Sequence, residues 1–168
     1  MAVMEPRLRR ARTADAAEIQ RLIKVYADHG QMLPRSLSEI YDNLRDFFVV
    51  EDTAGLVGCA ACHVTWEDLA EVKCMAVRED RHRQGWGRTL LEACLEDAAR
   101  VGVGRVFALT YIPEFFERRG FRRIEKHQLP QKIWTECIHC VNFPDCGEIA
   151  LIYELPSDAS QAGEHAGA

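Results

Sequence analysis

The sequence predicts a mixed α/β domain with a central, mostly antiparallel twisted sheet that is flanked by helices. Three observations predict it: helical spacing of apolar residues near the N-terminus, three consecutive apolar runs typical of an antiparallel meander, and a glycine-rich turn that enters a second amphipathic helix. The 168 residues, 48% hydrophobic and 28% charged, fit one compact domain, which we assign to residues 1–155. The end of the chain, residues 156–168, is rich in Ala, Ser and Gly and is expected to be a disordered tail.

The first elements are a short extended segment and two helices. Residues 8–11 (LRRA) are expected to be extended, and Thr13 and Asp15 give a start signal for the first helix. Apolar residues recur at helical spacing as far as Gly30, which can end that helix. After the segment QMLPRS, a second helix is expected over residues 38–45.

The remaining elements follow from apolar runs that are bounded by turn residues. These runs predict strands over residues 47–52, 56–64, 70–77, 105–110 and 147–155. The first three runs are consecutive, so an antiparallel meander is expected. A helix with one apolar face runs from Gly87 to Gly102, and a short helix in PEFFERRGF ends at Gly120.

Charge and hydropathy exclude several classes of protein. The net charge of −5 argues against a general nucleic-acid binder, which needs a basic face. The sequence has no secretory signal pattern and no apolar run long enough to span a bilayer, so we expect a cytoplasmic protein with no membrane partner. The seven cysteines therefore favour reduced thiols, packing residues or metal ligands over a disulfide framework.

The arginines are concentrated in two groups. One group consists of Arg78, Arg81, Arg83 and Arg88, and the other of Arg118, Arg119, Arg122 and Arg123. On an acidic chain such groups indicate either local anion sites or ordinary solvated faces, and the sequence leaves both open.

The most informative segment is VREDRHRQGWGR, which links a strand to the start of a helix. A glycine-rich connection at this place lets backbone N–H groups approach a pyrophosphate, and the helix dipole favours its negative charge. Gly85 and Gly87 keep the backbone open, while Arg83 and Arg88 supply charge-assisted donors. Alone, this pattern fits an ordinary tight turn equally well, and the Gly-Lys-Ser/Thr ending of a P-loop is absent.

The order of the elements, with the motifs V-x4-[QR]-x-x-G-x-G and FFERRGF, resembles the GNAT family of acetyl-CoA-dependent N-acetyltransferases from Leu8 to Leu155. One departure is His82, which stands where the family motif has Gln or Arg. The resemblance implies that acetyl-CoA lies in a V-shaped split between the two central strands. The residues that it implies in contact with acetyl-CoA are Met75, Ala76, Val77, His82, Arg83, Gln84, Gly85, Trp86, Gly87 and Arg88.

A narrower resemblance is carried by HGQMLPRS, AEVKCMAV, RVFALT and LPQKIW, which are similar to segments of the catalytic domain of N-acetylglutamate synthases. It implies transfer of acetyl to the α-amine of L-glutamate, a small-molecule substrate, in the first step of arginine biosynthesis. The chain has no room for the kinase-like domain that these enzymes often carry, so it resembles their short, stand-alone form. The substrate-binding positions that the resemblance implies are Leu33, Arg35, Lys73 and Cys74.

The same resemblance implies two catalytic positions. Glu71 occupies a strand position where family members often have a carboxylate, so it is the candidate for deprotonating the amine through water; a surface carboxylate is the alternative. Phe116 stands at the position of the family's proton-donating Tyr, so either Tyr111 or water must protonate the thiolate of coenzyme A. Family members are often dimers, and a homodimer is left open here.

The segment KIWTECIHCVNFPDCGEIA distinguishes this chain from the long synthases. Cys137, Cys140 and Cys146, with His139, offer three thiols and an imidazole, and the first two cysteines have metal-ligand spacing. No second C-x2-C pair supplies a clean fourth ligand, so zinc is an alternative that the sequence does not favour. Packing of the thiols as small apolar groups is the favoured interpretation, and a redox role for the first pair is a third.

Two other functions are compatible with the sequence. The first is an acetyltransferase with a different acceptor, such as another amino acid, a polyamine or a protein N-terminus. Arg35 and Lys73 favour an anionic acceptor over a polyamine, which would need carboxylates. The second is a non-catalytic acyl-CoA or metal-responsive module, which would suit the lack of a Tyr at Phe116.

Overall fold

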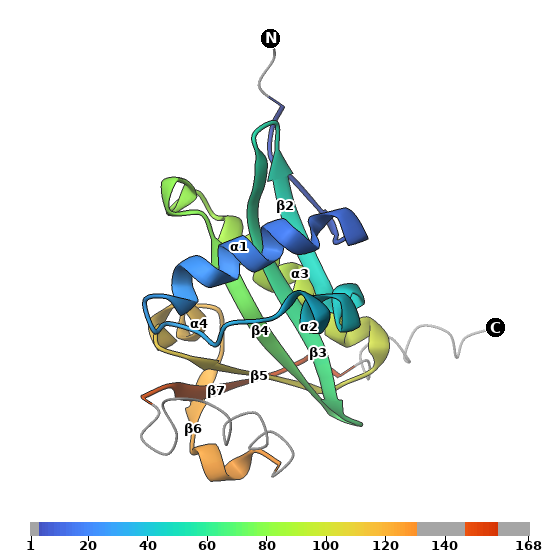
Figure 1. Cartoon of the computed structure of the whole chain (residues 1–168). Helices are drawn as coiled ribbons and strands as arrows, with labels where there is room; N and C mark the ends of the chain where they lie inside the picture. Colours follow the sequence, from blue (N-terminus) through green and yellow to red (C-terminus); the bar gives the residue numbers. More distant parts are fainter. Residues whose placement is uncertain (1–3, 131–146, 158–168) are drawn as a thin grey trace, which may run out of the picture.

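The computed structural model describes residues 4–130 and 147–157, and in these residues it confirms the mixed α/β fold (Figure 1). The strands form one sheet in the order β1-β2-β3-β4-β5-β7-β6. Their bounds are β1 (Arg7–Arg10), β2 (Phe47–Asp52), β3 (Gly55–Trp66), β4 (Leu69–Val77), β5 (Arg105–Thr110), β6 (Arg122–Ile124) and β7 (Ile149–Glu154). Neighbouring strands are antiparallel except β4 and β5, which are parallel.

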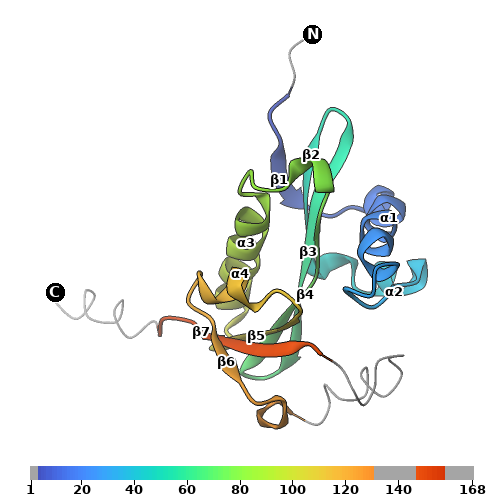
Figure 2. The same cartoon turned by 90° about the vertical axis from the view of Figure 1, so that its left-hand side faces the viewer.

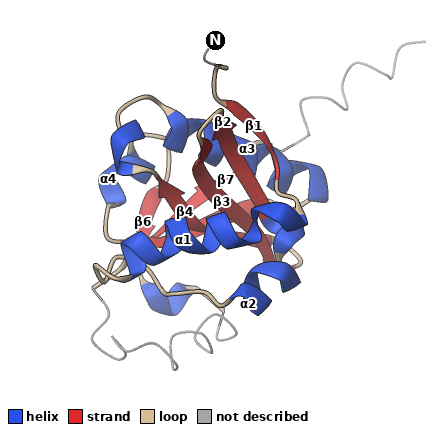
Figure 3. Ribbon diagram, turned by 45° about the horizontal axis from the view of Figure 1, so that its top comes forward, coloured by secondary structure: helices blue, strands red, loops and turns tan. Residues whose placement is uncertain are grey.

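Helices cover both faces of the sheet. They are α1 (Ala16–Ala27), α2 (Leu37–Asp42), α3 (Trp86–Val101) and α4 (Pro113–Glu117). Figure 2 shows α1 and α2 on one face and α3 and α4 on the other, and Figure 3 shows that α1 crosses β3 and β4. None of the helices in the described ranges is both long and apolar enough to cross a bilayer.

An apolar layer on each face of the sheet holds the helices in place. On β2, Phe47 and Val49 pack in the layer beneath α1, while Phe48 and Val50 pack in the layer beneath α3. Because successive side chains of a strand point to opposite faces, the unbroken apolar run FFVV serves both layers. The helices complete the layers with fully buried residues, among them Ile19 and Ile23 from α1 and Leu90, Leu91 and Cys94 from α3.

The predicted elements are found, with several strand ends shifted by one or two residues and with two larger differences. The helix expected over residues 38–45 ends at Asp42, because Asn43 leaves the helical region and its side-chain amide donates to the Glu39 carbonyl at 2.8 Å. The short strand β6 was not predicted, because its three residues RRI show no apolar alternation. The strands predicted over 47–52 and 105–110 have the expected bounds.

A mostly buried ion-pair network fixes the start of α1 against the sheet. Arg9 on β1 donates to both carboxylate oxygens of Asp15 at 2.7 and 2.9 Å, and to Glu51 on β2 at 2.7 Å. These hydrogen bonds lower the pKa of Asp15, and they lower the pKa of Glu51 to about 2. The position of α1 matters for the site, because α1 carries Tyr26 and leads into the loop 31–36.

Candidate active site

The central parallel strands separate into the V-shaped split that the sequence predicted. β4 and β5 pair only at Leu69 with Arg105, Ala70 with Val106, and Glu71 with Phe107. Beyond Glu71, β4 continues to Val77 and β5 to Thr110, and in the described part of the chain no ladder joins them there. Two strand edges that diverge in this way can hydrogen-bond an extended ligand placed between them.

β4 contains a bulge in the segment that lines this split. Cys59 on β3 pairs with Ala76, whereas Ala61 pairs with Lys73, so β4 has one extra residue between these pairs. Cys74 within the bulge has a φ of 54°, which is uncommon for a residue with a side chain. A bulge redirects the backbone groups and side chains around it, and bulges of this kind are frequent beside active sites.

The glycine-rich loop connects β4 to α3, and its two glycines meet different structural needs. Gly85 is the N-cap residue of α3 and has a φ of 87°, and Arg83 has a φ of 64°. Left-handed residues in such loops help to point successive backbone N–H groups at one place, where an anion can bind. Gly87 is needed for packing, because a Cβ there would lie 3.2 Å from the ring of Phe115 on α4.

Tyr26 of α1 ties this loop to the end of β4. Its hydroxyl donates to the Val77 carbonyl and lies 2.8 Å from His82 Nε2, which is itself 2.9 Å from the same carbonyl. Burial, followed by the charge of Glu79, raises the pKa of Tyr26, so the hydroxyl keeps its proton. The three contacts fit together when Tyr26 donates to the Val77 carbonyl and the Nε2–H tautomer of His82 shares its one hydrogen between the Tyr26 oxygen and the same carbonyl. His82 is therefore held by Tyr26 and by the Val77 carbonyl. The Gln or Arg of the family motif at this position does not indicate these contacts.

Replacement of Tyr26 by Phe should loosen this loop. Loss of a partly buried hydrogen bond costs about 1 kcal/mol, so we expect the KM for acetyl-CoA to rise about three- to tenfold with a smaller change in kcat. The measurement is steady-state kinetics at varied acetyl-CoA. Tyr41→Phe on α2 is the matched control, because Tyr41 is 51% exposed. An unchanged KM in the Tyr26 variant would show that the contact does not position the loop.

Carboxylates neutralise most of the arginines around the loop. The pairs are Arg78 with Asp80 at 2.8 Å, Arg88 with Glu92 at 2.8 Å, and Arg81 with Asp52. Asp52 is anchored on β2 with its side chain only 2% exposed, so Arg81 fixes the loop to the sheet. Within the described ranges, Arg83 is the loop arginine without a carboxylate partner, and it is exposed.

The residues predicted to bind the acceptor come from two distant segments that the structure brings together. Arg35 lies in the loop between α1 and α2, where its carbonyl accepts a hydrogen bond from Gln20 at 3.1 Å. The Arg35 side chain lies close enough to the Cys74 thiol on β4 for its charge to act on it. Burial raises the pKa of Cys74, and the nearby charges of Arg35 and Lys73 act in the opposite direction. Two cations therefore lie around the bulge of β4, and Leu33 is half-buried in the same loop as Arg35.

Glu71 lies at the point where β4 and β5 separate. It is two residues from Lys73, so both side chains leave β4 on the same face. Its ladder partner on β3 is His63, and His63 Nδ1 lies 2.6 Å from Asp46 Oδ2. His63 and Tyr26 were missed in the sequence, because a single His or Tyr inside an apolar run has no local signal of its own.

The candidate proton donor Tyr111 lies at the end of β5, and Phe116, at the position of the family's Tyr, lies on α4. Tyr111 directly follows β5 and is 38% exposed. Phe116 is buried, and its ring makes edge contacts with Phe115 and Phe121 at centroid distances of 5.1 and 5.2 Å. Phe116 is therefore a packing residue, and its side chain cannot donate a proton. The assignment of Tyr111 as the proton donor to coenzyme A stays a prediction.

The structure describes four of the seven cysteines. Cys137, Cys140 and Cys146, the candidate metal ligands, lie outside the described residues. Among the residues that are described, no group of three or more His, Cys, Asp or Glu side chains could hold a metal ion. Burial raises the pKa values of the thiols there, namely Cys59, Cys62, Cys74 and Cys94. These thiols are therefore poor nucleophiles at neutral pH.

Comparison with known sequences places the chain in a family. The sequence model of the acetyltransferase (GNAT) domain matches residues 43–123. An uncharacterised N-acetyltransferase of Chlorobaculum tepidum is 40% identical over 148 residues, which cover 88% of this chain and 96% of that protein. The amino-acid acetyltransferase of Mycobacterium tuberculosis is 37% identical over 155 residues, 90% of this chain and 88% of that protein.

Solved structures agree with this placement. N-acetylglutamate synthase from Neisseria gonorrhoeae, complexed with coenzyme A and N-acetyl-glutamate, superposes with a TM-score of 0.83 and 28% identity over 92% of this chain and 36% of that chain. Rv2747 from Mycobacterium tuberculosis, in complex with CoA, superposes with a TM-score of 0.77 and 30% identity over 89% of this chain and 99% of that chain. The sequence and the fold of this chain, including the split beside the glycine-rich loop, agree with those of these proteins. The chain therefore belongs to the GNAT family of acetyl-CoA-dependent N-acetyltransferases.

Proposed function

We propose that this enzyme transfers acetyl from acetyl-CoA to the α-amine of L-glutamate. The observation that carries the proposal is the meeting of Arg35 and Lys73 beside Glu71, where β4 and β5 separate. A glutamate acceptor has two carboxylates and one amine, and this group of side chains offers two cations and one carboxylate. The relatives named amino-acid acetyltransferase and the synthase complexed with N-acetyl-glutamate support an amino-acid acceptor.

For acetyl-CoA we assign two sets of contacts. The backbone of Met75, Ala76 and Val77 faces the pantetheine arm and the acetyl carbonyl in the split. The N–H groups of the loop 82–88 surround the pyrophosphate, with Arg83 as the exposed cation nearby. The anchoring of the loop by Tyr26 and Asp52 supports this assignment, because preorganised donors bind an anion at a lower entropic cost.

For the acceptor we assign Arg35 to one carboxylate, which its planar guanidinium can hold through two hydrogen bonds. Lys73 attracts the second carboxylate as a point charge. Leu33 and the backbone of Cys74 border the rest of the substrate. The hydrogen bond from Gln20 to the Arg35 backbone steadies the loop that carries the guanidinium.

The proposed chemistry needs a neutral amine and a protonated leaving group. Glu71 accepts a proton from the α-ammonium through water, and the amine then attacks the thioester carbonyl. Backbone N–H groups of the bulged segment of β4 stabilise the negative charge that develops on the carbonyl oxygen. The thiolate of coenzyme A takes a proton from Tyr111 or from water. The new amide bond replaces the thioester, and one proton is released overall.

The acceptor is identified by incubating the enzyme with acetyl-CoA and single candidates: the common amino acids, two polyamines and a short peptide. Mass spectrometry of the products avoids interference from the protein's own thiols. The proposal expects N-acetylglutamate as the dominant product. A different acetylated amino acid would retain the enzyme class and overturn the glutamate assignment, and an acetylated polyamine or peptide would overturn the amino-acid acceptor altogether.

A further inference from the structure

A histidine–carboxylate pair lies at the edge of the sheet face that carries the proposed acceptor group. His63 Nδ1 on β3 is 2.6 Å from Oδ2 of Asp46, the residue directly before β2. The two side chains are 37% and 28% exposed, so water reaches both of them. The proposed chemistry gives this pair no role, although it lies within one strand of Glu71.

The fold places His63 directly beside Glu71. The two residues are ladder partners on β3 and β4. Side chains of directly opposed residues leave a sheet on the same face, with their Cβ atoms about 5 Å apart. Ala61, two residues before His63, packs in the layer beneath α1, so His63 and Glu71 lie on that face. Lys73, the ladder partner of Ala61, lies there as well.

Asp46 determines how the imidazole is presented. Figure 1 shows β3 between β2 and β4, so Asp46 and Glu71 flank His63 from opposite sides. The two nitrogens of an imidazole point in nearly opposite directions, and with Nδ1 toward Asp46 the Nε2 atom faces the β4 side. A carboxylate that accepts the Nδ1–H selects the tautomer in which Nε2 carries a lone pair. Among the described residues, none forms a hydrogen bond with this Nε2.

The proton relay assigned to Glu71 needs a water molecule with a fixed orientation. This water accepts a proton from the α-ammonium on its oxygen, so its own two hydrogens must be held by acceptors. The Glu71 carboxylate is one acceptor, and His63 Nε2 is a second one on the neighbouring strand. Lys73 cannot take this place, because an ammonium group only donates hydrogen bonds. A water held at both hydrogens is preorganised for the transfer.

We propose that His63, held by Asp46, is a positioning residue that orients the water through which Glu71 deprotonates the acceptor amine. In this step the α-ammonium gives a proton to the water, and the water gives one of its hydrogens to the Glu71 carboxylate. The amine is left neutral, and His63 keeps its protonation state. The inference rests on the proposed role of Glu71, and it holds for any acceptor amine.

The test compares two replacements that each keep one half of the imidazole. His63→Asn keeps an N–H donor for Asp46 and loses the acceptor at the Nε2 position, whereas His63→Gln can place an amide oxygen near that position. We expect kcat to fall about 10- to 100-fold in His63→Asn and clearly less in His63→Gln, with an unchanged KM for acetyl-CoA. Asp46→Asn should lower kcat about three- to tenfold, because its amide can donate to Nδ1 and so reverse the tautomer.

Steady-state kinetics with the acceptor found in the product analysis gives these constants, and thermal unfolding of each variant shows whether it folds. His29→Asn is the matched control, because the exposed His29 also has its Nδ1 close to an oxygen, 2.6 Å from the Val25 carbonyl. It should keep the wild-type kcat. A folded His63→Asn variant with wild-type kcat would overturn the proposal, and so would a His63→Gln variant that loses more activity than His63→Asn.

A double variant separates this inference from the proposed role of Glu71. If His63 acts through Glu71, adding His63→Asn to Glu71→Gln should lower kcat no further than Glu71→Gln alone. Losses that multiply in the double variant would show that His63 acts independently, which contradicts the inference and leaves the role of Glu71 intact. A wild-type kcat in Glu71→Gln would contradict the role of Glu71 itself, and the inference with it.

Discussion

Replacement of Glu71 by Gln is expected to lower kcat for acetyl transfer to L-glutamate by about 10²- to 10⁴-fold at neutral pH. The amide keeps the shape of the side chain but cannot accept the proton of the α-ammonium, so the amine must deprotonate without help. The KM for acetyl-CoA should change little, because Glu71 lies where the split begins and not in the glycine-rich loop. Steady-state kinetics with both substrates varied separates these two parameters.

The matched control for this prediction is Glu67→Gln. Glu67 lies in the turn between β3 and β4, so the variant removes a nearby carboxylate from the same hairpin and should retain full activity. The activity of the Glu71→Gln variant should also recover at high pH, where the free amine becomes more abundant. Retention of wild-type kcat by Glu71→Gln would remove Glu71 from the chemistry, and His63, its ladder partner, would become the next candidate base.

Replacement of Arg35 by Ala is expected to raise the KM for L-glutamate by about 10- to 100-fold. A guanidinium that holds a carboxylate through two charged hydrogen bonds contributes to binding before the chemical step, so kcat should fall less than KM rises. Arg35→Lys should lie between the wild type and Arg35→Ala, because a lysine keeps the charge without the planar fork. Initial rates at varied L-glutamate and saturating acetyl-CoA give both constants.

Arg21→Ala is the control for Arg35, since Arg21 is an exposed arginine on α1, the helix that leads into the same loop. Its KM for L-glutamate should equal that of the wild type. The charge of Arg35 also acts on the buried Cys74 thiol, so thermal unfolding of each variant must be measured alongside. A folded Arg35→Ala variant with unchanged KM would place the substrate carboxylates elsewhere.

Local sequence signals were sufficient for most of the fold. The apolar runs FFVVED and RVFALT are bounded by turn residues, and β2 and β5 have the predicted bounds. The loop pattern also predicted that α3 would begin among the glycines, and Gly85 takes the left-handed conformation that favours glycine. The sequence did not predict why Gly87 is needed, because its neighbour Phe115 comes from another helix and only tertiary packing brings the two together.

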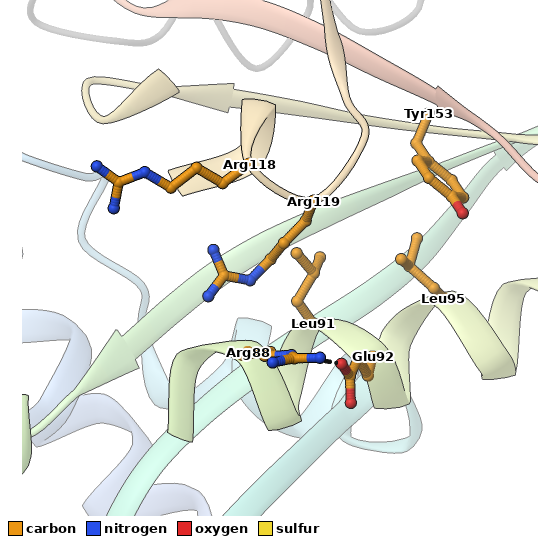
Figure 4. A pocket seen from close by; sticks show the side chains of 7 residues that line it. All are labelled: Arg88, Leu91, Glu92, Leu95, Arg118, Arg119 and Tyr153. Atoms are coloured by element: carbon orange, nitrogen blue, oxygen red, sulfur yellow. Dashed lines mark hydrogen bonds and ion pairs between the residues drawn. The ribbon is translucent and has the colours of Figure 1, made fainter. Parts of the chain in front are cut away.

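The contacts that build the site were harder to predict. Tyr26 and His82 are 56 residues apart in the sequence, and their contact depends on how α1 crosses the sheet. Likewise, the sequence left open whether the clustered arginines are anion sites or solvated faces. The structure divides the two groups: carboxylates pair with most of the arginines, whereas Arg118 and Arg119, which have no carboxylate partner among the described residues, line one cavity (Figure 4). Which arginines pair with carboxylates depends on how side chains from separate elements are placed in space. The spacing of residues along the sequence does not give these positions.

The central claim is that the acceptor is recognised through two carboxylates, and the most direct test compares L-glutamate with L-glutamine. The two molecules share the α-amine, the α-carboxylate and almost the same size, and they differ in the charge at the end of the side chain. The account predicts a kcat/KM at least about 100-fold higher for L-glutamate, because the positive charges of Arg35 and Lys73 attract both of its carboxylates and L-glutamine brings only one. Equal values, or a preference for L-glutamine, would contradict it.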